Sequence, residues 1–423
     1  MLPAFSSLPG YAGRARPELR ARVGLRSVQA SPFKETKINP LALSEQEQMI
    51  RDSIRRIAQE HFKPGAAAAD REYRPPIENI KVLADNGFAG VAIPEEYGGL
   101  GLGVFELMLI MEEVSRACAN TAMLMGGTGG GPTPRVIAAV GTDALKKKFL
   151  PKMAKGELFA AWSMSEPNAG SDVGNVQTKA IRDGNEYVIN GSKMWCSGAQ
   201  LADVFLVLVR LDPTPGMKGV GAIMIERGTP GFEIGKHLDL IGLHATGMAP
   251  LYFEDCRVPA ENVIIPAGGM RKLFEILDDD RVVGNPSICL GVASAALEDA
   301  LAYTRERKQF GRALTEFQGL QWKLADMAID LEAGRTLLYA AARKAAAGHL
   351  TPMDASVAKV YVNEMSQRVT NSAIQVCGAY GLSNEFPFER YYRDVRGFAI
   401  GYGTTEIHRN SIAREMILGN YKP

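Results

Sequence analysis

The sequence has few residues that could tie a fold together covalently or through metal ions. Its five cysteines lie far apart and none belongs to a CxxC pair, which argues against a disulfide framework and a structural zinc site. The five histidines show no HxxxH or HExxH spacing, the usual arrangement on a zinc-binding helix. We therefore expect no metal site and a reducing compartment.

The sequence also has no excess of positive or negative charge and no long apolar stretch. The 48 basic and 47 acidic residues leave a net charge of +1, so no strong field favours nucleic acid as a partner. No run of about 18 apolar residues occurs, the length that a membrane-spanning helix needs. With 46% hydrophobic and 22% charged residues, the composition is that of an ordinary folded enzyme, with neither nucleic acid nor an integral membrane position expected.

The N-terminal segment differs from the rest of the chain. Residues 1–33 carry five arginines among small and hydroxylated residues, with Glu18 as the single acid. Arg-rich, acid-poor starts are typical of mitochondrial transit peptides, which predicts the mitochondrial matrix for this protein. The alternative is a disordered basic extension on a cytoplasmic protein. We leave residues 1–36 out of the fold argument in either case.

The periodicity of the remaining chain changes from helical to alternating and back. Residues 37–155 have apolar residues at helical spacing. Residues 156–270 contain short alternating runs between Gly and Pro turns, including a hairpin predicted to turn at Asn190–Gly191. Residues 271–423 contain long helical stretches rich in small residues. This order predicts an α+β fold with an N-terminal helical domain, a central β domain and a C-terminal helical domain.

Nucleotide-binding signatures based on glycine loops are missing. The sequence has no GxxxxGK[ST] phosphate loop and no GxGxxG after a strand, so a Rossmann dinucleotide site is not expected.

Seven short motifs nevertheless occur in order along the chain: MSEPNAGSD (164–172), GSKMWCSG (191–198), RERKQFG (305–311), FQ (317–318), QVCGAYG (375–381), RYYRDVRG (390–397) and GTTEIHR (403–409). Together they resemble the acyl-CoA dehydrogenase family, flavoproteins that introduce a double bond beside a thioester carbonyl. The resemblance runs from about Leu43 to Asn420. It implies FAD as cofactor, a β-barrel-like central domain and a C-terminal four-helix bundle.

The first motif shows why these segments suit a flavin. Its small residues let backbone N–H groups approach a ligand closely, although a simple turn would have the same composition. In the GSKMWCSG motif the resemblance implies an aromatic ring against the flavin and a hydroxyl near its reactive nitrogen. The residues that it assigns to FAD are Trp162, Met164, Ser165, Gly170, Ser171, Trp195, Cys196, Ser197, Arg307, Gln318, Gln375, Val376, Cys377, Gly378, Ala379, Thr404, Thr405 and Glu406.

The resemblance also implies an oligomer. In the family, the residues matching Arg307 and Gln318 hold the diphosphate of a flavin bound mainly by the neighbouring subunit, and a guanidinium suits phosphate bidentately. We therefore expect a homotetramer, or at minimum a dimer. Three positions depart from the family pattern: Ala379 replaces a glycine, and His244 and Met248 replace polar groups.

The catalytic base is the largest departure. Most members carry a glutamate at the position of Tyr402, and a phenol with a pKa of about 10 is a poor base at neutral pH. Isovaleryl-CoA dehydrogenases place the glutamate before an arginine that starts a core helix, and here Asp280 precedes Arg281. We predict Asp280 as the base. The alternative is that Asp278, Asp279 and Asp280 form a solvated acidic helix start.

Two functions remain open on these residues. The first is α,β-dehydrogenation of a short, branched or alicyclic acyl-CoA, with electrons passed to an electron-transfer flavoprotein. The second is the same fold without dehydrogenation, either lyase-like or without a catalytic base, and Tyr402 favours it while Asp280 argues against it. The residues predicted to bind the acyl-CoA substrate are Ser171, Asp278, Arg281, Tyr402 and Gly403.

Overall fold

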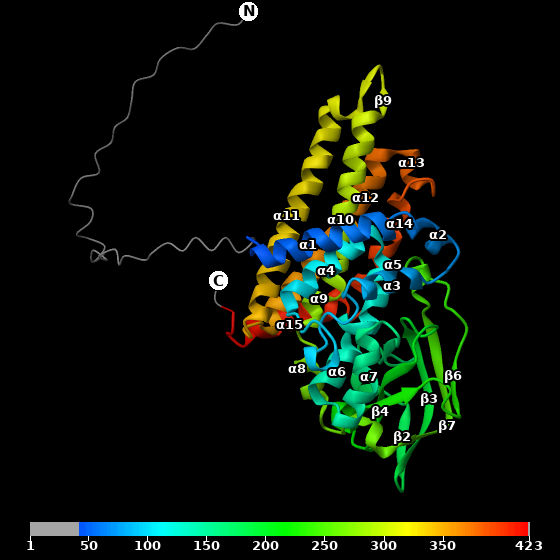
Figure 1. The fold of residues 1–423 in the computed structure, drawn as a ribbon. Coiled ribbons are helices and arrows are strands. Elements are labelled where there is room, and N and C mark those ends of the chain that lie inside the picture. The colour runs from blue at the N-terminus through cyan, green and yellow to red at the C-terminus, as the bar shows by residue number, and fades with distance from the viewer. Residues whose placement is uncertain (1–41, 422–423) are drawn as a thin grey trace, which may run out of the picture. The chain divides into compact units, whose positions relative to one another are not determined.

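A computed structural model of the chain describes residues 42–421 (Figure 1), so the predicted extension over residues 1–36 lies outside them. The first helices form the N-terminal part of the fold. Their bounds are α1 (Glu45–Ile57), α2 (Ala66–Arg71), α3 (Ile77–Asp85), α4 (Val104–Ala117), α5 (Ala119–Met125), α6 (Pro132–Val140) and α7 (Asp143–Ala154).

Local signals in the sequence explain where several of these helices begin and end. Ser44 and Glu47 form the reciprocal hydrogen bonds of a capping box at the start of α1. Helix α3 ends at Asp85 and is followed by Asn86 and Gly87, residues that commonly stop a helix. Almost every residue of α4 is buried, as its apolar sequence predicts.

The middle of the chain forms one sheet of eight strands in the order β6-β7-β3-β2-β4-β5-β8, with β1 pairing parallel to β4. Strands β4 and β5 are buried along nearly their whole length because helices cover the sheet on one side and other strands lie on the other. The strands are β1 (Ala160–Ser163), β2 (Lys179–Asp183), β3 (Glu186–Cys196), β4 (Val204–Arg210), β5 (Val220–Glu226), β6 (Phe232–Ile234), β7 (Ala249–Pro259) and β8 (Val263–Ile265).

The predicted turn at Asn190–Gly191 is wrong. Strand β3 runs straight through both residues, and the turn of the β2–β3 hairpin lies at Gly184 instead. The pairing of β3 with β7 shifts register between Ile189 and Gly191, which marks a bulge. Gly191 is required there because a Cβ atom would lie 2.7 Å from the Thr178 Cα. The glycine thus permits a close strand contact, not a turn.

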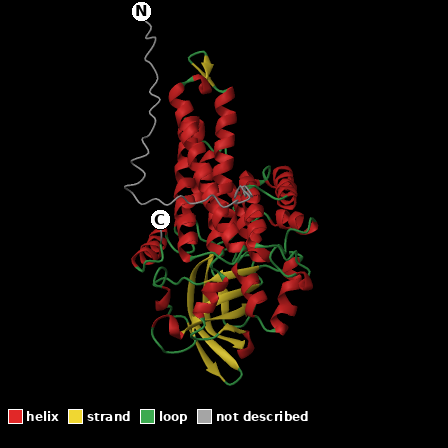
Figure 2. Ribbon diagram, turned by 90° about the vertical axis from the view of Figure 1, so that its left-hand side faces the viewer, coloured by secondary structure: helices red, strands yellow, loops and turns green. Residues whose placement is uncertain are grey.

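The last third of the chain returns to helices, which Figure 2 shows in red above the sheet. Thr351 caps α12 and Pro352 occupies its first turn, a position that favours proline. The elements are α8 (Met270–Ile276), α9 (Asp280–Val283), α10 (Asn285–Glu306), β9 (Lys308–Gln309), β10 (Arg312–Ala313), α11 (Gln318–Ala346), α12 (Pro352–Cys377), α13 (Ala379–Leu382), α14 (Phe388–Arg396) and α15 (Thr405–Ile417).

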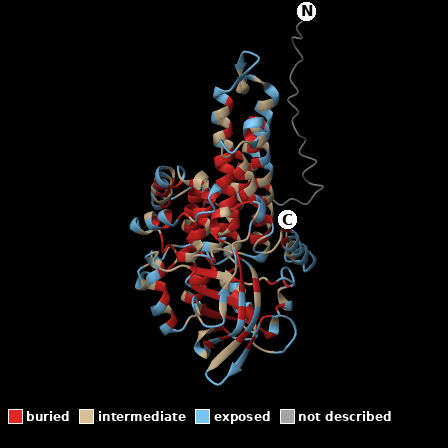
Figure 3. Cartoon of the chain, turned by 90° about the vertical axis from the view of Figure 1, so that its right-hand side faces the viewer, coloured by how far each residue is buried: buried red, intermediate tan, exposed pale blue. Residues whose placement is uncertain are grey.

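Helices from both ends of the chain share one hydrophobic core (Figure 3). Helix α4 packs on α10 closely enough that a Cβ atom on Gly291 would lie 2.1 Å from the Glu112 carbonyl oxygen. This contact explains the small residues along α10. The helix–sheet–helix order confirms the predicted fold class. Among residues 42–421, no helix has the length and apolar character that a bilayer crossing requires.

Two adjacent carboxylates of α4 are buried in this core, and each has a partner on another helix. The Arg55 guanidinium of α1 donates two hydrogen bonds to Glu113, at 2.6 and 2.8 Å. The Tyr339 hydroxyl of α11 donates to Glu112 at 2.8 Å, and burial raises the pKa of Glu112. The buried charges therefore join α4 to helices that lie far apart in the sequence.

We expect Arg55→Met to lower the free energy of unfolding by about 3 kcal/mol, because it leaves the Glu113 carboxylate, only 2% exposed, without its counter-charge. Thermal and urea unfolding of the full chain measure the effect. Arg74→Met is the matched control, since the side chains of Arg74 and Glu78 are 47% and 55% exposed and such pairs contribute at most about 1 kcal/mol. Equal losses in both variants would contradict the expectation.

Candidate active site

The loops after β1 and at the end of β3 bring the first two motifs side by side. The Met194 N–H donates to the Ser165 carbonyl at 2.9 Å, and the Cys196 thiol lies 3.6 Å from the Trp162 carbonyl. Trp195 has a φ of 61°, a left-handed conformation that is strained for a bulky residue. Its ring is 53% exposed. The strained backbone at Trp195 thus exposes a flat apolar ring beside polar backbone groups. This combination fits a planar cofactor.

A buried ion pair supports this surface from behind. The Lys193 ammonium donates to Glu166 at 2.7 Å and to the Met164 carbonyl at 3.1 Å. Glu166 also accepts the backbone N–H groups of Gln177 and Thr178. Burial lowers the pKa of Lys193 to about 8, and the Glu166 charge offsets part of that shift.

We did not predict this pair from the sequence, although a signal for it was present. The lysine lies within an alternating stretch predicted to form strands, and in β3 its side chain is fully buried, between the half-buried Ser192 and Met194. A lysine at an inward position of a strand requires a buried partner, and Glu166 in the neighbouring motif is that partner.

The other residues of the first motifs differ in exposure. Gly170 and Ser171 are exposed at the surface of the loop, whereas Cys196 is fully buried. Ser197 is half-buried. Cys196 can therefore contribute to a bound cofactor only through its backbone, while the other three have accessible groups.

Helix α6 connects this surface to the predicted base region. The Thr133 hydroxyl donates to the Ala161 carbonyl of β1 at 2.9 Å. Two residues further on, Arg135 forms an ion pair with Asp279 and donates to the Ile276 carbonyl at 3.2 Å. One short helix therefore fixes the distance between the β1 strand and the α8–α9 turn.

The two alternative positions for a base lie on segments that a hydrogen bond joins. Helix α9 begins at Asp280, whose side chain is outside the described residues. At the start of α10, the Asn285 amide donates to the Gly401 carbonyl at 3.0 Å, which holds the Tyr402 loop against the α9–α10 junction. Tyr402 is 39% exposed. The structure thus brings together segments that the sequence separates by more than a hundred residues.

The neighbours of Asp280 are described. Arg281 lies 3.4 Å from Asp278, and burial raises the pKa of Asp278. Asp279 is half-buried and pairs with Arg135. Asp278 and Asp279 are therefore partly buried and paired with arginines, and the assignment of Asp280 as the base stays a prediction.

The last motif starts α15. The Thr404 hydroxyl caps the helix by accepting the Ile407 N–H at 3.2 Å. Thr405 is buried and Glu406 is exposed. Gly403 adopts a φ of 85° directly before the cap, so the Tyr402–Gly403 turn is set by the start of this helix.

The remaining predicted cofactor residues lie elsewhere, at the end of the helical bundle away from the sheet (Figures 1 and 2). Arg307 ends α10, and its guanidinium lies 5.6 Å from the centre of the Tyr380 ring. This contact joins the RERKQFG and QVCGAYG motifs. Gln318, Gln375, Gly378 and Ala379 are exposed, while Val376 and Cys377 are buried. The structure therefore separates the predicted FAD residues of one chain into two groups.

His244, one of the positions that depart from the family pattern, has several partners in this structure. The His244 ring contacts the Leu240 carbonyl at 2.8 Å and Asp70 at 3.3 Å, and it stacks on Tyr73 with ring centres 4.4 Å apart. Arg393 lies 2.6 Å from the same Asp70. His244 and Arg393 thus share Asp70 as a partner.

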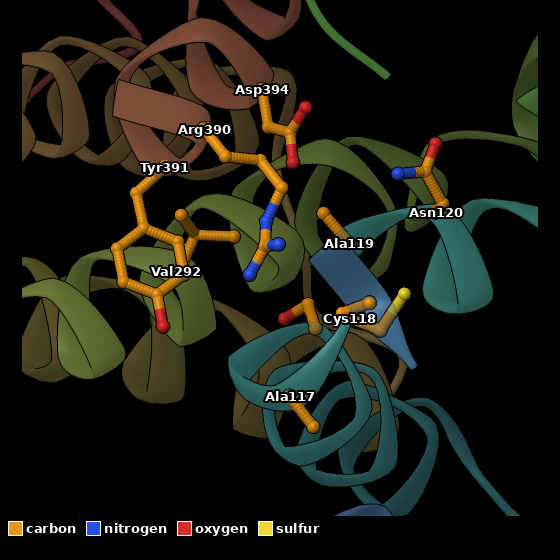
Figure 4. A pocket seen from close by; sticks show the side chains of 10 residues that line it. Ala117, Cys118, Ala119, Asn120, Val292, Arg390, Tyr391 and Asp394 are labelled. Atoms are coloured by element: carbon orange, nitrogen blue, oxygen red, sulfur yellow. The ribbon is translucent and has the colours of Figure 1, made fainter. Parts of the chain in front are cut away.

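Two pockets lie outside the candidate site. Figure 4 shows Arg390, Tyr391 and Asp394 of α14 across a cavity of about 10 Å³ from the α4–α5 junction, which has room for about one water molecule. A wider pocket of about 550 Å³ is bordered by Tyr73 and His244. Neither pocket is lined by a residue predicted for cofactor or substrate. In the described part of the chain, no group of three or more His, Cys, Asp or Glu side chains is arranged to hold a metal ion.

Models of protein families cover nearly all of the described chain. The acyl-CoA dehydrogenase N-terminal domain matches residues 44–157, the middle domain matches residues 161–256, and the C-terminal domain matches residues 268–417.

Curated relatives span the same length. An acryloyl-CoA reductase (NADH) of Anaerotignum propionicum is 38% identical over 379 residues, which cover 89% of this chain and 95% of that protein. A mitochondrial isovaleryl-CoA dehydrogenase of Solanum tuberosum is also 38% identical, with 89% and 92% covered.

Solved structures agree with these relatives. Butyryl-CoA dehydrogenase from Megasphaera elsdenii superposes with a TM-score of 0.84 at 34% identity, covering 89% of this chain and 99% of that chain. A structure described as the electron transferring flavoprotein of Acidaminococcus fermentans contains a chain with a TM-score of 0.85 at 35% identity, with the same coverage. An FAD complex of PigA has a TM-score of 0.84 at 27% identity, again with 89% and 99% covered. The chain therefore belongs to the acyl-CoA dehydrogenase family, whose members are FAD-binding oxidoreductases.

Proposed function

We propose that the protein catalyses α,β-dehydrogenation of a short, branched or alicyclic acyl-CoA, with Asp280 as the base. The observation that carries the proposal is the joining of three segments at one place. Helix α6 links β1 to the α8–α9 turn, and Asn285 links the α9–α10 junction to the Tyr402 loop. A base at the start of α9 is thereby held at a fixed distance from the surface formed by Trp162 and Trp195.

The chemistry needs a carboxylate positioned to remove the proton alpha to the thioester carbonyl. Asp280 is the residue to which we assign this task, while the Tyr402 ring fills the space that a glutamate occupies in most relatives. Arg281 and Asp278 border the acyl group, and Gly403 and Ser171 contact the thioester and CoA. FAD, when bound, supplies the acceptor for the β-hydrogen and its electron pair.

The cofactor residues belong to two subunits in this proposal. Trp195, Met164 and Ser165 hold the flavin ring of their own chain. Arg307 and Gln318 lie at the far end of the bundle and hold the diphosphate of a neighbouring chain's FAD, because one chain cannot place both groups on one cofactor. The site is complete only in a homo-oligomer, and we propose a homotetramer.

The proposal also includes a partner, a location and a division of the chain. Electrons leave to an electron-transfer flavoprotein, which the similarity to a chain in the Acidaminococcus fermentans structure supports. The basic N-terminal segment supports the mitochondrial matrix, with a cytoplasmic position as the alternative. Residues 1–36 then form a leader, and residues 37–155, 156–270 and 271–423 form the three domains.

A second candidate is non-oxidative chemistry on the same fold, or binding of acyl-CoA without catalysis. Tyr402 at the usual glutamate position is the observation that favours it. Relatives include an acryloyl-CoA reductase, so reduction of an enoyl thioester is a further direction for the same site.

Anaerobic mixing of the FAD-loaded protein with saturated acyl-CoA esters distinguishes these candidates. We expect at least one short, branched or alicyclic ester to bleach the oxidised flavin band, since the base and the flavin act on the same substrate. An artificial electron acceptor then ranks the esters by turnover. No bleaching with any ester would contradict dehydrogenation and favour the second candidate.

We expect Asp280→Asn to reduce its flavin roughly 10²–10⁴-fold more slowly than the parent, because the nearly isosteric amide cannot accept the proton. Tyr402→Phe is the matched control, since it removes only a hydroxyl and should cost far less. Single-turnover flavin reduction measures the chemical step apart from acceptor steps. If Asp280→Asn were as fast as the parent while Tyr402→Phe were slow, the base would be assigned wrongly.

We expect Arg307→Ala to weaken FAD binding by about tenfold, because it removes a charge-assisted contact to the diphosphate. Arg305→Ala removes the same charge from an exposed neighbouring position and should retain its FAD. The flavin-to-protein ratio after dialysis measures retention, and light scattering gives the oligomeric state. A monomer with stoichiometric flavin would show that one chain suffices.

A further inference from the structure

Buried side chains of three helices form hydrogen bonds to the loop that carries Tyr402. Its carbonyl groups at Phe398, Gly401 and Tyr402 point toward α12, α10 and α15 and accept hydrogen bonds from them. Tyr402 itself has a φ of 58°. A tyrosine persists in this unfavourable conformation only where surrounding contacts impose it.

One of these contacts comes from Lys359 on α12. Its ammonium donates to the Gly401 carbonyl at 2.6 Å, and the side chain is fully buried. Within the described residues, no carboxylate forms an ion pair with Lys359. Burying a lysine without a counter-charge is unfavourable, and one hydrogen bond to a carbonyl offsets only part of that cost. A lysine at this position is therefore understandable if the position of the carbonyl matters.

The same loop has two further supports. The Asn285 amide donates to the same Gly401 carbonyl at 3.0 Å. His408 contacts the Tyr402 carbonyl at 3.2 Å, so its Nε2 is the donor, and its Nδ1 accepts from the Ser356 hydroxyl at 3.1 Å. Burial lowers the pKa of His408 to about 4, which keeps the ring neutral and this hydrogen-bond pattern fixed above that pH.

We propose that Lys359 is a positioning residue, whose amine, together with Asn285, holds the Gly401 carbonyl and so fixes the left-handed turn that presents Tyr402 to the acyl pocket. The inference rests on the proposed function only in placing Tyr402 in that pocket. The anchoring of the turn is a property of the chain itself, and it can be measured without substrate.

The charged and titratable groups around the amine set its pH dependence. Arg281 of α9, His408 of α15 and Cys289 of α10 face it. Burial lowers the pKa of Lys359 to about 7, below its unfolded value. The unfolded chain therefore binds more protons above pH 7, so this group makes stability rise with pH between about 7 and 10.5.

Hydrogen exchange of the FAD-loaded full chain tests the proposal. In Lys359→Met, amides of residues 397–404 should exchange at least about tenfold faster, because the hydrogen bond from the Lys359 amine to the Gly401 carbonyl is lost. Thr370→Val is the matched control: Thr370 is a buried α12 residue whose hydroxyl bonds only to carbonyls of its own helix. It should leave exchange in residues 397–404 unchanged.

Two further readouts separate positioning from general stability. The change in melting temperature from pH 7 to pH 9 should be less positive in Lys359→Met than in the parent, and the same as the parent's in Thr370→Val. Single-turnover flavin reduction by a reactive acyl-CoA should slow in Lys359→Met by about tenfold or more, with FAD retained. If the parent itself bleaches with no acyl-CoA, the proposed function fails while the exchange experiment still decides the role of Lys359.

Unchanged exchange over residues 397–404 in Lys359→Met would overturn the proposal. If that variant does not fold, Asn285→Ala decides the question, because it removes one of the two donors to the same carbonyl and leaves the lysine in place. Exchange over residues 397–404 should then rise by a few fold, and no rise would overturn the proposal equally.

Discussion

The close packing of α4 on α10 is the contact on which the other parts of the structure depend. It requires a glycine at position 291, because any side chain there would strike the α4 backbone at Glu112. The contact places helices from both ends of the chain in one core, while the segment between them in the sequence forms the sheet. As a result, α6 reaches β1 with Thr133 and the α8–α9 turn with Arg135.

Buried charges near the candidate site are used to hold backbone. Lys193 contacts the Met164 carbonyl in the loop after β1, and Lys359 contacts the Gly401 carbonyl in the Tyr402 loop. Burying an ammonium is unfavourable in both cases, and it lowers the pKa of both lysines. In each case the lysine holds backbone near a residue in a left-handed conformation, Trp195 or Tyr402. Rigid supports of this kind keep reacting groups in place during catalysis.

The distribution of the predicted cofactor residues bears on assembly. Trp162 and Trp195 belong to the sheet end of the chain, while Arg307 and Gln318 belong to the opposite end of the helical bundle. An arginine stacked near Tyr380 on an exposed helix end has little structural value alone. Its position is understandable if it serves a cofactor bound by another copy, as the proposed function requires.

The sequence by itself determined the helix–sheet–helix order, because periodicity and capping residues such as Ser44 and Thr351 act within a few positions of the chain. It determined the family through short motifs with local backbone roles. Only the tertiary structure decided that Asn190–Gly191 lies within a strand, because the reason is the close approach of the backbone at Thr178, just before β2. It alone joined Asn285 to Gly401 and Lys359 to the same carbonyl. Such contacts depend on packing between helices distant in sequence, and no local pattern encodes them.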